Sequence, residues 1–249
     1  ILRATSYEFR SKVESAAWRK SWDCVHFIVN ILACVVLGVF FANLFMGIPV
    51  DANGVYQGNL LKLFNIYGIA GGIFFTLIFM MHGAIWLTIK TRGPLQAKAF
   101  LAAGMLWVGV AAMLIIFLIL TLFYTNIYSN YLRMPWLVAL PLLAVFGLAC
   151  IPRLLNENRP LMAWLSSALF IVCTTFFGVM GIYPNMIISS IDPKGTITAF
   201  NGCSTPMTLE IMLIVALVMV PIVLLYQFWM YRLFYKPVSV EDLNLDHAY

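Results

Sequence analysis

Three histidines, His26, His82 and His247, are the residues of this chain best suited to bind a metal or carry a proton. A neutral imidazole is a common axial ligand of haem iron, and histidine changes its charge near neutral pH. His82, in the stretch FMMHGAIW, lies eight residues before Lys90. On a helix this spacing corresponds to about 12 Å from the nearest charged end.

Three interpretations of His82 follow from this position. We favour a core histidine whose hydrogen bonds are satisfied within the protein. The second interpretation is an interhelical hydrogen bond or a quinone contact, and the third is haem ligation. A bound haem commonly needs a second ligand or a distal pocket, and no other histidine lies as deep in an apolar segment.

The other ionisable candidates lie at the edges of apolar segments. His26, between Asp23 and Asn30, is predicted to form hydrogen bonds at a helix boundary, and His247 is predicted to be solvated. Glu210 follows a predicted helix start in the stretch STPMTLE. A helix N-terminus favours negative charge, so we interpret Glu210 as stabilising this end, with proton handling as the alternative.

The five cysteines show no C-x-x-C motif and no paired spacing that would indicate a metal site. Four of them lie within or at the edge of apolar segments, where cysteine behaves as a small hydrophobic residue. The fifth, Cys203, lies in a polar loop. The four are Cys24, Cys34, Cys150 and Cys173.

The composition indicates an integral membrane protein. Of the 249 residues, 63% are hydrophobic and 10% are charged, and the mean hydropathy is +0.93. A soluble domain carries about 25% charged residues, so a chain this apolar needs lipid as its solvent. The net charge of +5 comes from basic residues in short loops, which indicates a membrane face rather than a nucleic-acid partner.

Six segments are long and apolar enough to span a bilayer as helices of about 20 residues. They are too long for barrel strands, and lipid satisfies no backbone polar group. We therefore predict an all-α, polytopic helical bundle that forms a single membrane domain over residues 1–249. The predicted elements are a partly helical cytoplasmic connection 1–23, helices 24–46, 64–89, 97–124, 134–152, 161–183 and 208–235, and a cytoplasmic tail 236–249.

Lys and Arg are distributed unevenly between alternate connections. Twelve lie in the opening segment, in the connections 90–98 and 153–160, and near the end of the chain. The other connections hold three, which are Lys62, Arg133 and Lys194. Because cytoplasmic loops carry the excess of basic residues, the sequence predicts that both ends of this chain are cytoplasmic.

The central zones of the six predicted spans contain no Asp, Glu, Lys or Arg. Such residues mark ion paths and substrate sites, so their absence argues against proton-coupled transport by these helices alone. Other residues indicate packing. Gly68 and Gly72 form a GxxxG step that favours close helix contact, and Pro221 is expected to kink the last span. The loop 184–207 is expected to fold over the helix ends.

Three blocks of sequence resemble subunit II of the cytochrome bd-type quinol oxidases. They are RATSYEFRSKVESAAWRKSWD, then ANLFMGIPV followed by YQGNLLKLFNIYGIAGG, and NGCSTPMTLEIMLIVALVMVPIVLLYQFWMYRLFY. The blocks occur in the family's order and span the chain. The residues assigned to motifs by this resemblance are Arg3, Glu8, Arg10 and Lys12 in the opening, Asn43, Gly47 and Pro49 in the loop, and Pro221 in the last helix.

The resemblance implies a larger subunit with about nine transmembrane helices, of which about three would precede this chain. The residues before Arg3 read like the end of such a helix. It also implies a chain that has no catalytic residue and binds no haem, because two haems b and one haem d belong to subunit I. The complex would oxidise quinol and reduce dioxygen to water, generating a proton motive force without pumping.

The same resemblance implies a location and partners. Subunit II would support subunit I and help shape proton and oxygen access in the bacterial cytoplasmic (inner) membrane. Some relatives hold a structural quinone, and a small single-helix accessory subunit is a further expected partner; no nucleic acid is expected. Arg3 is expected near the subunit boundary or the oxygen-access region.

The resemblance also bears on the alternatives. His82 stands where relatives carry His or Gln, which weakens haem ligation, and the position of Glu210 need not be acidic. The competing functions are a helical secondary transporter or channel subunit, and a b-haem membrane anchor. A transporter usually shows broken helices or polar residues at the midplane, and an anchor needs two histidines on facing helices.

Overall fold

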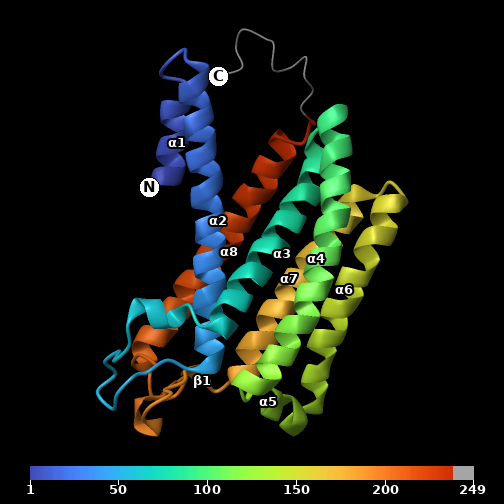
Figure 1. Cartoon of the computed structure of the whole chain (residues 1–249). Helices are drawn as coiled ribbons and strands as arrows, with labels where there is room; N and C mark the ends of the chain where they lie inside the picture. Colours follow the sequence, from blue (N-terminus) through green and yellow to red (C-terminus); the bar gives the residue numbers. More distant parts are fainter. Residues whose placement is uncertain (238–249) are drawn as a thin grey trace.

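The structure, a computed structural model, describes residues 1–237. His247 and most of the predicted tail lie outside the described residues. The described chain is mainly helical, with two short strands in one loop (Figure 1). The α-helices are α1 (Leu2–Arg10), α2 (Ala16–Met46), α3 (Ile66–Lys90), α4 (Pro94–Tyr124), α5 (Ile127–Arg133), α6 (Ala139–Asn156), α7 (Pro160–Ile182) and α8 (Pro206–Leu233). The shorter elements are η1 (Leu60–Leu63), η2 (Pro135–Val138), η3 (Pro193–Gly195), β1 (Asn185–Ile187) and β2 (Ile197–Thr198).

Six helical segments among residues 1–237 are long and apolar enough to cross a membrane. They are α2, α3, α4, η2 with α6, α7 and α8. A helix satisfies its backbone hydrogen bonds within one segment, which is why these apolar stretches can enter lipid. The all-α, polytopic membrane fold predicted from the sequence is confirmed.

Helix α3 lies at the centre of the packing. It contacts α2, α4 and α7, while α6 packs against α7 and α4. Tyr67, Phe74 and Met81 from α3 are fully buried and meet Phe170 of α7 in one apolar core. The buried hydroxyl of Tyr67 lies 2.9 Å from Thr121 Oγ1 on α4. These contacts hold α3 rigidly between its neighbours.

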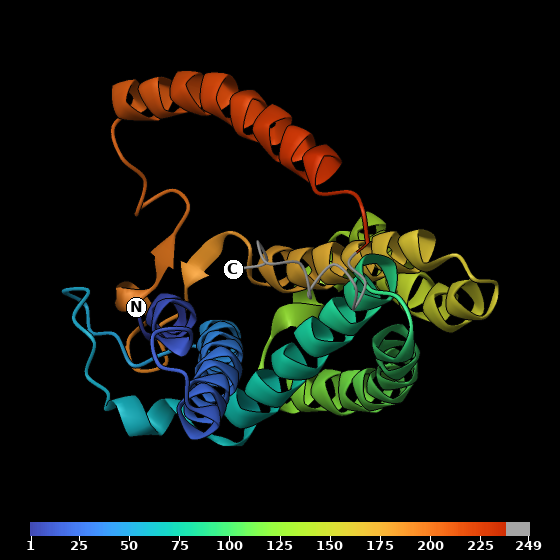
Figure 2. The same cartoon turned by 90° about the horizontal axis from the view of Figure 1, so that it is seen from above.

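Helix α8 lies apart from the other helices (Figure 2). None of its residues is buried against the rest of the described chain. Contacts near its C-terminal end tie it to α3: the rings of Trp86 and Tyr231 lie 5.6 Å apart, and Lys90 Nζ donates to the carbonyl of Tyr235 at 3.2 Å. The helix remains continuous through Pro221 and is curved in Figure 2.

The opening segment folds as a helical hairpin rather than as a connection followed by a span beginning at residue 24. α1 ends at Arg10, and α2 begins at Ala16, so α2 extends well beyond the apolar stretch. Aromatic side chains explain the early start. Phe9 of α1 packs against Trp22 of α2, with ring centroids 5.6 Å apart, and this contact stabilises helix at the polar end of α2.

The loop that follows α7 covers the opposite end of α2. Strands β1 and β2 pair in antiparallel fashion. The amide of Ile48 donates to the Ile188 carbonyl at 2.9 Å, and the amide of Ser190 donates to the Ile48 carbonyl at 3.0 Å. This long loop therefore folds over a helix end, as the sequence predicts.

Candidate functional site

His82 lies on α3 and bonds to α7. Its Nδ1 is 2.7 Å from Ser167 Oγ, and the Ser167 hydroxyl also lies 2.7 Å from the Trp164 carbonyl. A carbonyl oxygen only accepts hydrogen bonds, so the single proton of the Ser167 hydroxyl goes to the Trp164 carbonyl. The Ser167 oxygen therefore accepts from Nδ1–H of His82. The imidazole also packs on the Trp164 ring, with centroids 5.1 Å apart.

This geometry makes His82 a link between two helices of the bundle. A metal would have to bind through Nε2, with the bond from Nδ1–H to Ser167 fixing the ring. Within residues 1–237, no group of three His, Cys, Asp or Glu side chains is arranged to hold a metal ion. The contact expected between His82 and a quinone or a haem stays a prediction.

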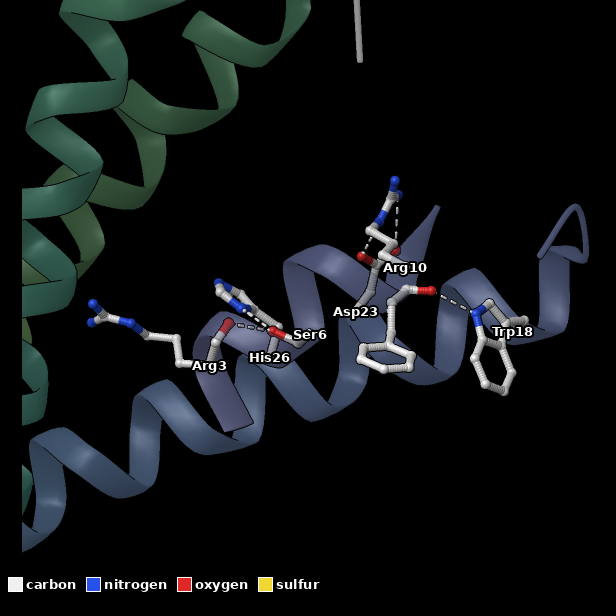
Figure 3. A network of polar contacts seen from close by, with 7 residues as sticks. Arg3, Ser6, Arg10, Trp18, Asp23 and His26 are labelled. Atoms are coloured by element: carbon white, nitrogen blue, oxygen red, sulfur yellow. Dashed lines mark hydrogen bonds and ion pairs between the residues drawn. The ribbon is translucent and has the colours of Figure 1, made fainter. Parts of the chain in front are cut away.

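A second polar cluster joins α1 to the start of α2 (Figure 3). Arg10 forms a two-point pair with Asp23, in which Nε lies 2.6 Å from Oδ1 and Nη2 lies 3.2 Å from Oδ2. Lys12, in the turn after α1, has its Nζ 3.2 Å from Oε1 of Glu8 on that helix. All four side chains are exposed, so these pairs add little stability and chiefly fix the geometry of the hairpin.

Ser6 is the buried centre of that hairpin. Its hydroxyl donates to the carbonyl of Arg3 at 2.7 Å, and its oxygen lies 2.8 Å from His26 Nδ1. The edge of the His26 ring meets Tyr7 at 4.5 Å. His26 therefore forms a hydrogen bond, as predicted, but it lies well inside α2 rather than at a helix boundary, because α2 begins at Ala16. The Arg3 side chain extends away from this pair in Figure 3.

Asn43 joins α2 to the start of α3. Its side-chain nitrogen Nδ2 donates to the Leu63 carbonyl at 2.8 Å, and its side-chain oxygen Oδ1 accepts from Nδ2 of Asn65 at 2.8 Å. Asn65 is the N-cap of α3, because its own oxygen accepts from the amide of Gly68 at 2.7 Å. The motif residue Asn43 thus fixes where the next span begins.

Glycines let α2 and α3 approach closely. A Cβ at Gly68 would lie 2.8 Å from Asn43 Nδ2, and one at Gly72 would lie 3.0 Å from the Val35 carbonyl oxygen. The tightest contact between the two helices involves two glycines that the sequence did not single out. A Cβ at Gly38 would lie 2.4 Å from the carbonyl oxygen of Gly71. A further glycine close in sequence to a GxxxG step is the signal that identifies such a contact.

The loop after α2 carries the remaining motif residues. Gly47 ends α2 with a φ of +98°, a backbone conformation that favours glycine, and it packs against Ile188. The Pro49 carbonyl accepts from the amide of Gln57 at 2.8 Å. The carboxylate of Asp51 accepts from the amides of Asn53 and Val55 and from the Gln57 side chain. These bonds, the one from Val55 foremost, hold the pKa of Asp51 below its ordinary value of 3.8.

The structure qualifies the prediction for Glu210. The Thr205 side chain accepts from the amide of Thr208 at 3.4 Å and Pro206 is the first helical residue, so the predicted helix start is confirmed. Glu210 is exposed and follows the first turn of α8, which contains no acidic residue. The field of a helix terminus falls off within one turn, so the stabilising role of Glu210 is weaker than expected.

The cysteines behave as small apolar or exposed residues. All five are free thiols in the part of the chain that the structure describes, and Cys173 is buried in the bundle core. Ser167, which binds His82, and Asn65, which caps α3, are functional partners that sequence reasoning missed. A small polar residue inside or at the start of an apolar span is the signal that would have identified both.

Comparisons with known proteins cover nearly the whole chain. A family model described as cytochrome bd terminal oxidase subunit II matches residues 1–234. The chain is 29% identical to cytochrome bd ubiquinol oxidase subunit 2 of Bacillus subtilis, over 96% of this chain and 70% of the relative. It is 26% identical to cytochrome bd-I ubiquinol oxidase subunit 2 of Escherichia coli K12, over 98% and 73%. The chain therefore belongs to the cytochrome bd terminal oxidase subunit II family.

Proposed function

We propose that this chain is the non-haem subunit II of a cytochrome bd-type quinol oxidase. The observation that carries the proposal is the family match over residues 1–234, supported by relatives named as subunit 2 of cytochrome bd ubiquinol oxidases. In the net reaction, two quinols and one dioxygen give two quinones and two waters, with four electrons passing from the quinols to dioxygen. Family membership gives no support to the transporter, channel or haem-anchor alternatives.

The redox centres of this complex belong, in our proposal, to subunit I, with two haems b and one haem d. Subunit II would then act as a scaffold that shields the haem core and shapes proton and oxygen access. No side chain of this chain takes a catalytic role.

The exposed surfaces of α8 and α2 support a scaffolding role. α8 is apolar on all sides and is not covered by other residues of the described chain, and α2 exposes Phe27, Leu32 and Phe40. Lipid or another protein must cover such surfaces. We assign part of this surface to contact with subunit I, with Arg3 near the boundary because its side chain extends away from the hairpin. A small single-helix subunit is a further proposed neighbour.

A structural quinone is a further proposed component. An apolar cavity of about 300 Å³ lies between α2, α3, α4 and α7, lined by rings such as Phe41, Phe74 and Phe117. Its few polar groups include the hydroxyls of Thr121 and Thr174, and His82 is not in its wall. These residues fit the isoprenoid tail of a quinone better than its polar ring.

The proposed location is the bacterial cytoplasmic membrane, with the basic loops on the cytoplasmic side. Twelve of the fifteen Lys and Arg residues lie in the opening segment, in or next to two short loops, and at or just after the end of α8. The named relatives are bacterial proteins, which supports the assignment.

The test is a reduced-minus-oxidised absorption spectrum of the intact detergent-solubilised complex, captured through a tag at the C-terminus of this chain. We expect a red chlorin band from haem d together with b-type bands, both lost when this chain is separated from its partner. A complex without haem would overturn the oxidase assignment. Haem bands retained by the separated chain would overturn the placement of the haems on subunit I.

A further inference from the structure

A basic cleft of about 850 Å³ opens at the end of the bundle that carries the basic loops. Three parts of the chain form it: the α3–α4 loop, the α6–α7 loop with the start of α7, and the segment after α8. Arg92 and Arg159 lie in its wall, together with the polar residues Thr91, Gln96 and Asn158. A cleft of this size can hold a small organic anion or a lipid headgroup.

The two arginines are available to an external anion. Arg92 is exposed and makes no ion pair within residues 1–237. Arg159 lies 4.0 Å from Glu157, but that carboxylate pairs more closely with Arg153, at 3.0 Å. Glu157 is thus largely neutralised from its other side. Two guanidinium groups facing one cleft match a phosphate, which accepts two parallel hydrogen bonds from each arginine.

The backbone adds to the positive potential of the cleft. Helices α4 and α7 both begin at it, and among residues 1–237 no side chain caps the free amide groups of either first turn. Those amides contribute partial positive charge where a phosphate oxygen would lie. Lys90, close by, is already engaged by the carbonyls of Phe234 and Tyr235 and serves to attach α8.

The apolar side of the cleft distinguishes a lipid from a free anion. Ile89, Leu161 and Met162 lie in its wall beside the arginines. From there the surface of α7 continues with exposed apolar side chains, 47% exposed at Leu161 and 48% at Leu165. A phosphate bound at the arginines would therefore have apolar surface beside it, along which acyl chains can run into the bilayer.

We propose that this cleft binds the phosphate group of an anionic phospholipid, with Arg92 and Arg159 as its ligands and the exposed face of α7 as the path of the acyl chains. Basic pockets between transmembrane helices on the cytoplasmic side are the usual sites for anionic lipid headgroups. This site goes beyond the proposed oxidase function and does not depend on it.

The test uses the intact complex, stripped of loosely held lipid in detergent and titrated with phosphatidylglycerol while bound lipids are counted by native mass spectrometry. We expect one tight adduct whose affinity falls about tenfold or more in Arg92→Gln/Arg159→Gln. The matched control is Lys20→Gln/Lys98→Gln, which removes two exposed charges from the same membrane face outside the cleft and should leave that adduct unchanged.

Further arms of the experiment separate the ligand sources. Phosphatidylcholine should not replace the tight adduct, and millimolar inorganic phosphate should not displace it. Equal lipid binding by the wild type and by Arg92→Gln/Arg159→Gln would overturn the site. Displacement of the adduct by millimolar phosphate would overturn the lipid assignment. Arg92→Lys/Arg159→Lys, which keeps the charge, should retain part of the affinity. An unchanged haem spectrum in every variant shows that the complex is intact.

Discussion

Helices α3 and α8 are both apolar enough to span a membrane, but they are covered in opposite ways. In the most apolar part of α3, 33% of residues are buried within the chain, and in α8 none is. α3 has four glycines, and a Cβ added at three of them would lie within 4 Å of α2, whereas α8 has no glycine. Small residues let helix backbones meet, whereas large side chains all round a helix keep neighbours at a distance.

The comparison separates two properties that hydropathy alone confuses. Apolar length determines whether a helix enters the membrane, but the positions of small and polar residues determine whether its own chain covers it there. α3 also forms side-chain hydrogen bonds to its neighbours. Tyr67 bonds to Thr121 of α4, and His82 bonds to Ser167 of α7. At the N-terminus of α3, its cap Asn65 bonds to Asn43 of α2. α8 is held near its C-terminal end and by the loop that precedes it, so its surface is available to lipid and to a partner subunit.

The largest expected effect comes from truncating the same residue type in the two environments. Phe170→Ala removes a fully buried ring that meets Phe74 in the core, and we expect a loss of about 3–5 kcal/mol. Phe228→Ala, on α8, removes a ring that is 68% exposed and should cost much less. Thermal unfolding of the two variant complexes measures the difference. Equal costs would show that α8 is packed in the complex as tightly as α7.

A smaller effect is expected from adding one methyl group on α3. A Cβ at Gly71 would lie 2.6 Å from the Cβ of Ala42, so Gly71→Ala should destabilise the chain by about 1–3 kcal/mol. Gly83→Ala is the matched control on the same helix, because no atom of the described residues outside the helix lies within 4 Å of the Cβ that this substitution adds. It should be neutral or mildly stabilising. Similar melting temperatures for the two variants would contradict the close contact between α2 and α3.

The hydrogen bond between His82 and Ser167 should contribute about 0.5–1.5 kcal/mol. A double-mutant cycle with His82→Leu and Ser167→Ala measures this coupling energy, and His82→Gln tests whether an amide at this position can replace the imidazole. We expect the reduced-minus-oxidised haem spectrum to be the same in all variants. A lost or shifted b-type band in His82→Leu alone would instead identify His82 as a haem ligand.

The sequence predicted the six spans and the all-α class because apolar length is a local property. It also predicted the cap at Thr205, since a threonine before a proline at a helix start satisfies a local rule. That the helix runs continuously from Ala16 into the span was not evident from the sequence, because a contact such as that between Phe9 and Trp22 extends the helix beyond its apolar stretch. Hydropathy carries no information about such pairs.

The candidate sites were less predictable than the fold. His82 was identified from its depth, but its partner Ser167 lies 85 residues further along the chain. The basic cleft combines three loops that are remote in sequence, and each alone resembles an ordinary cytoplasmic loop. The sequence also could not predict that the rest of the described chain leaves α8 uncovered. A helix that faces lipid and a helix that packs against a partner have the same composition.

The smallest expected effect lies outside the membrane, in the loop that leads from α2 towards α3. The pKa of Asp51 is lower in the folded than in the unfolded protein. Its carboxylate therefore stabilises the loop fully at pH values above the unfolded pKa, and this stabilisation is lost as the pH falls through the lowered, folded-state pKa. Hydrogen exchange of the amides of Asn53 and Val55 should therefore speed up, relative to the intrinsic rate, when the wild type is acidified. Asp51→Ala, which removes the acceptor of both amides, should show faster exchange at neutral pH and little further change in acid. Equal protection of these amides in both proteins at neutral pH would show that the tight turn after α2 is held by the backbone pairing with the loop after α7 rather than by the carboxylate.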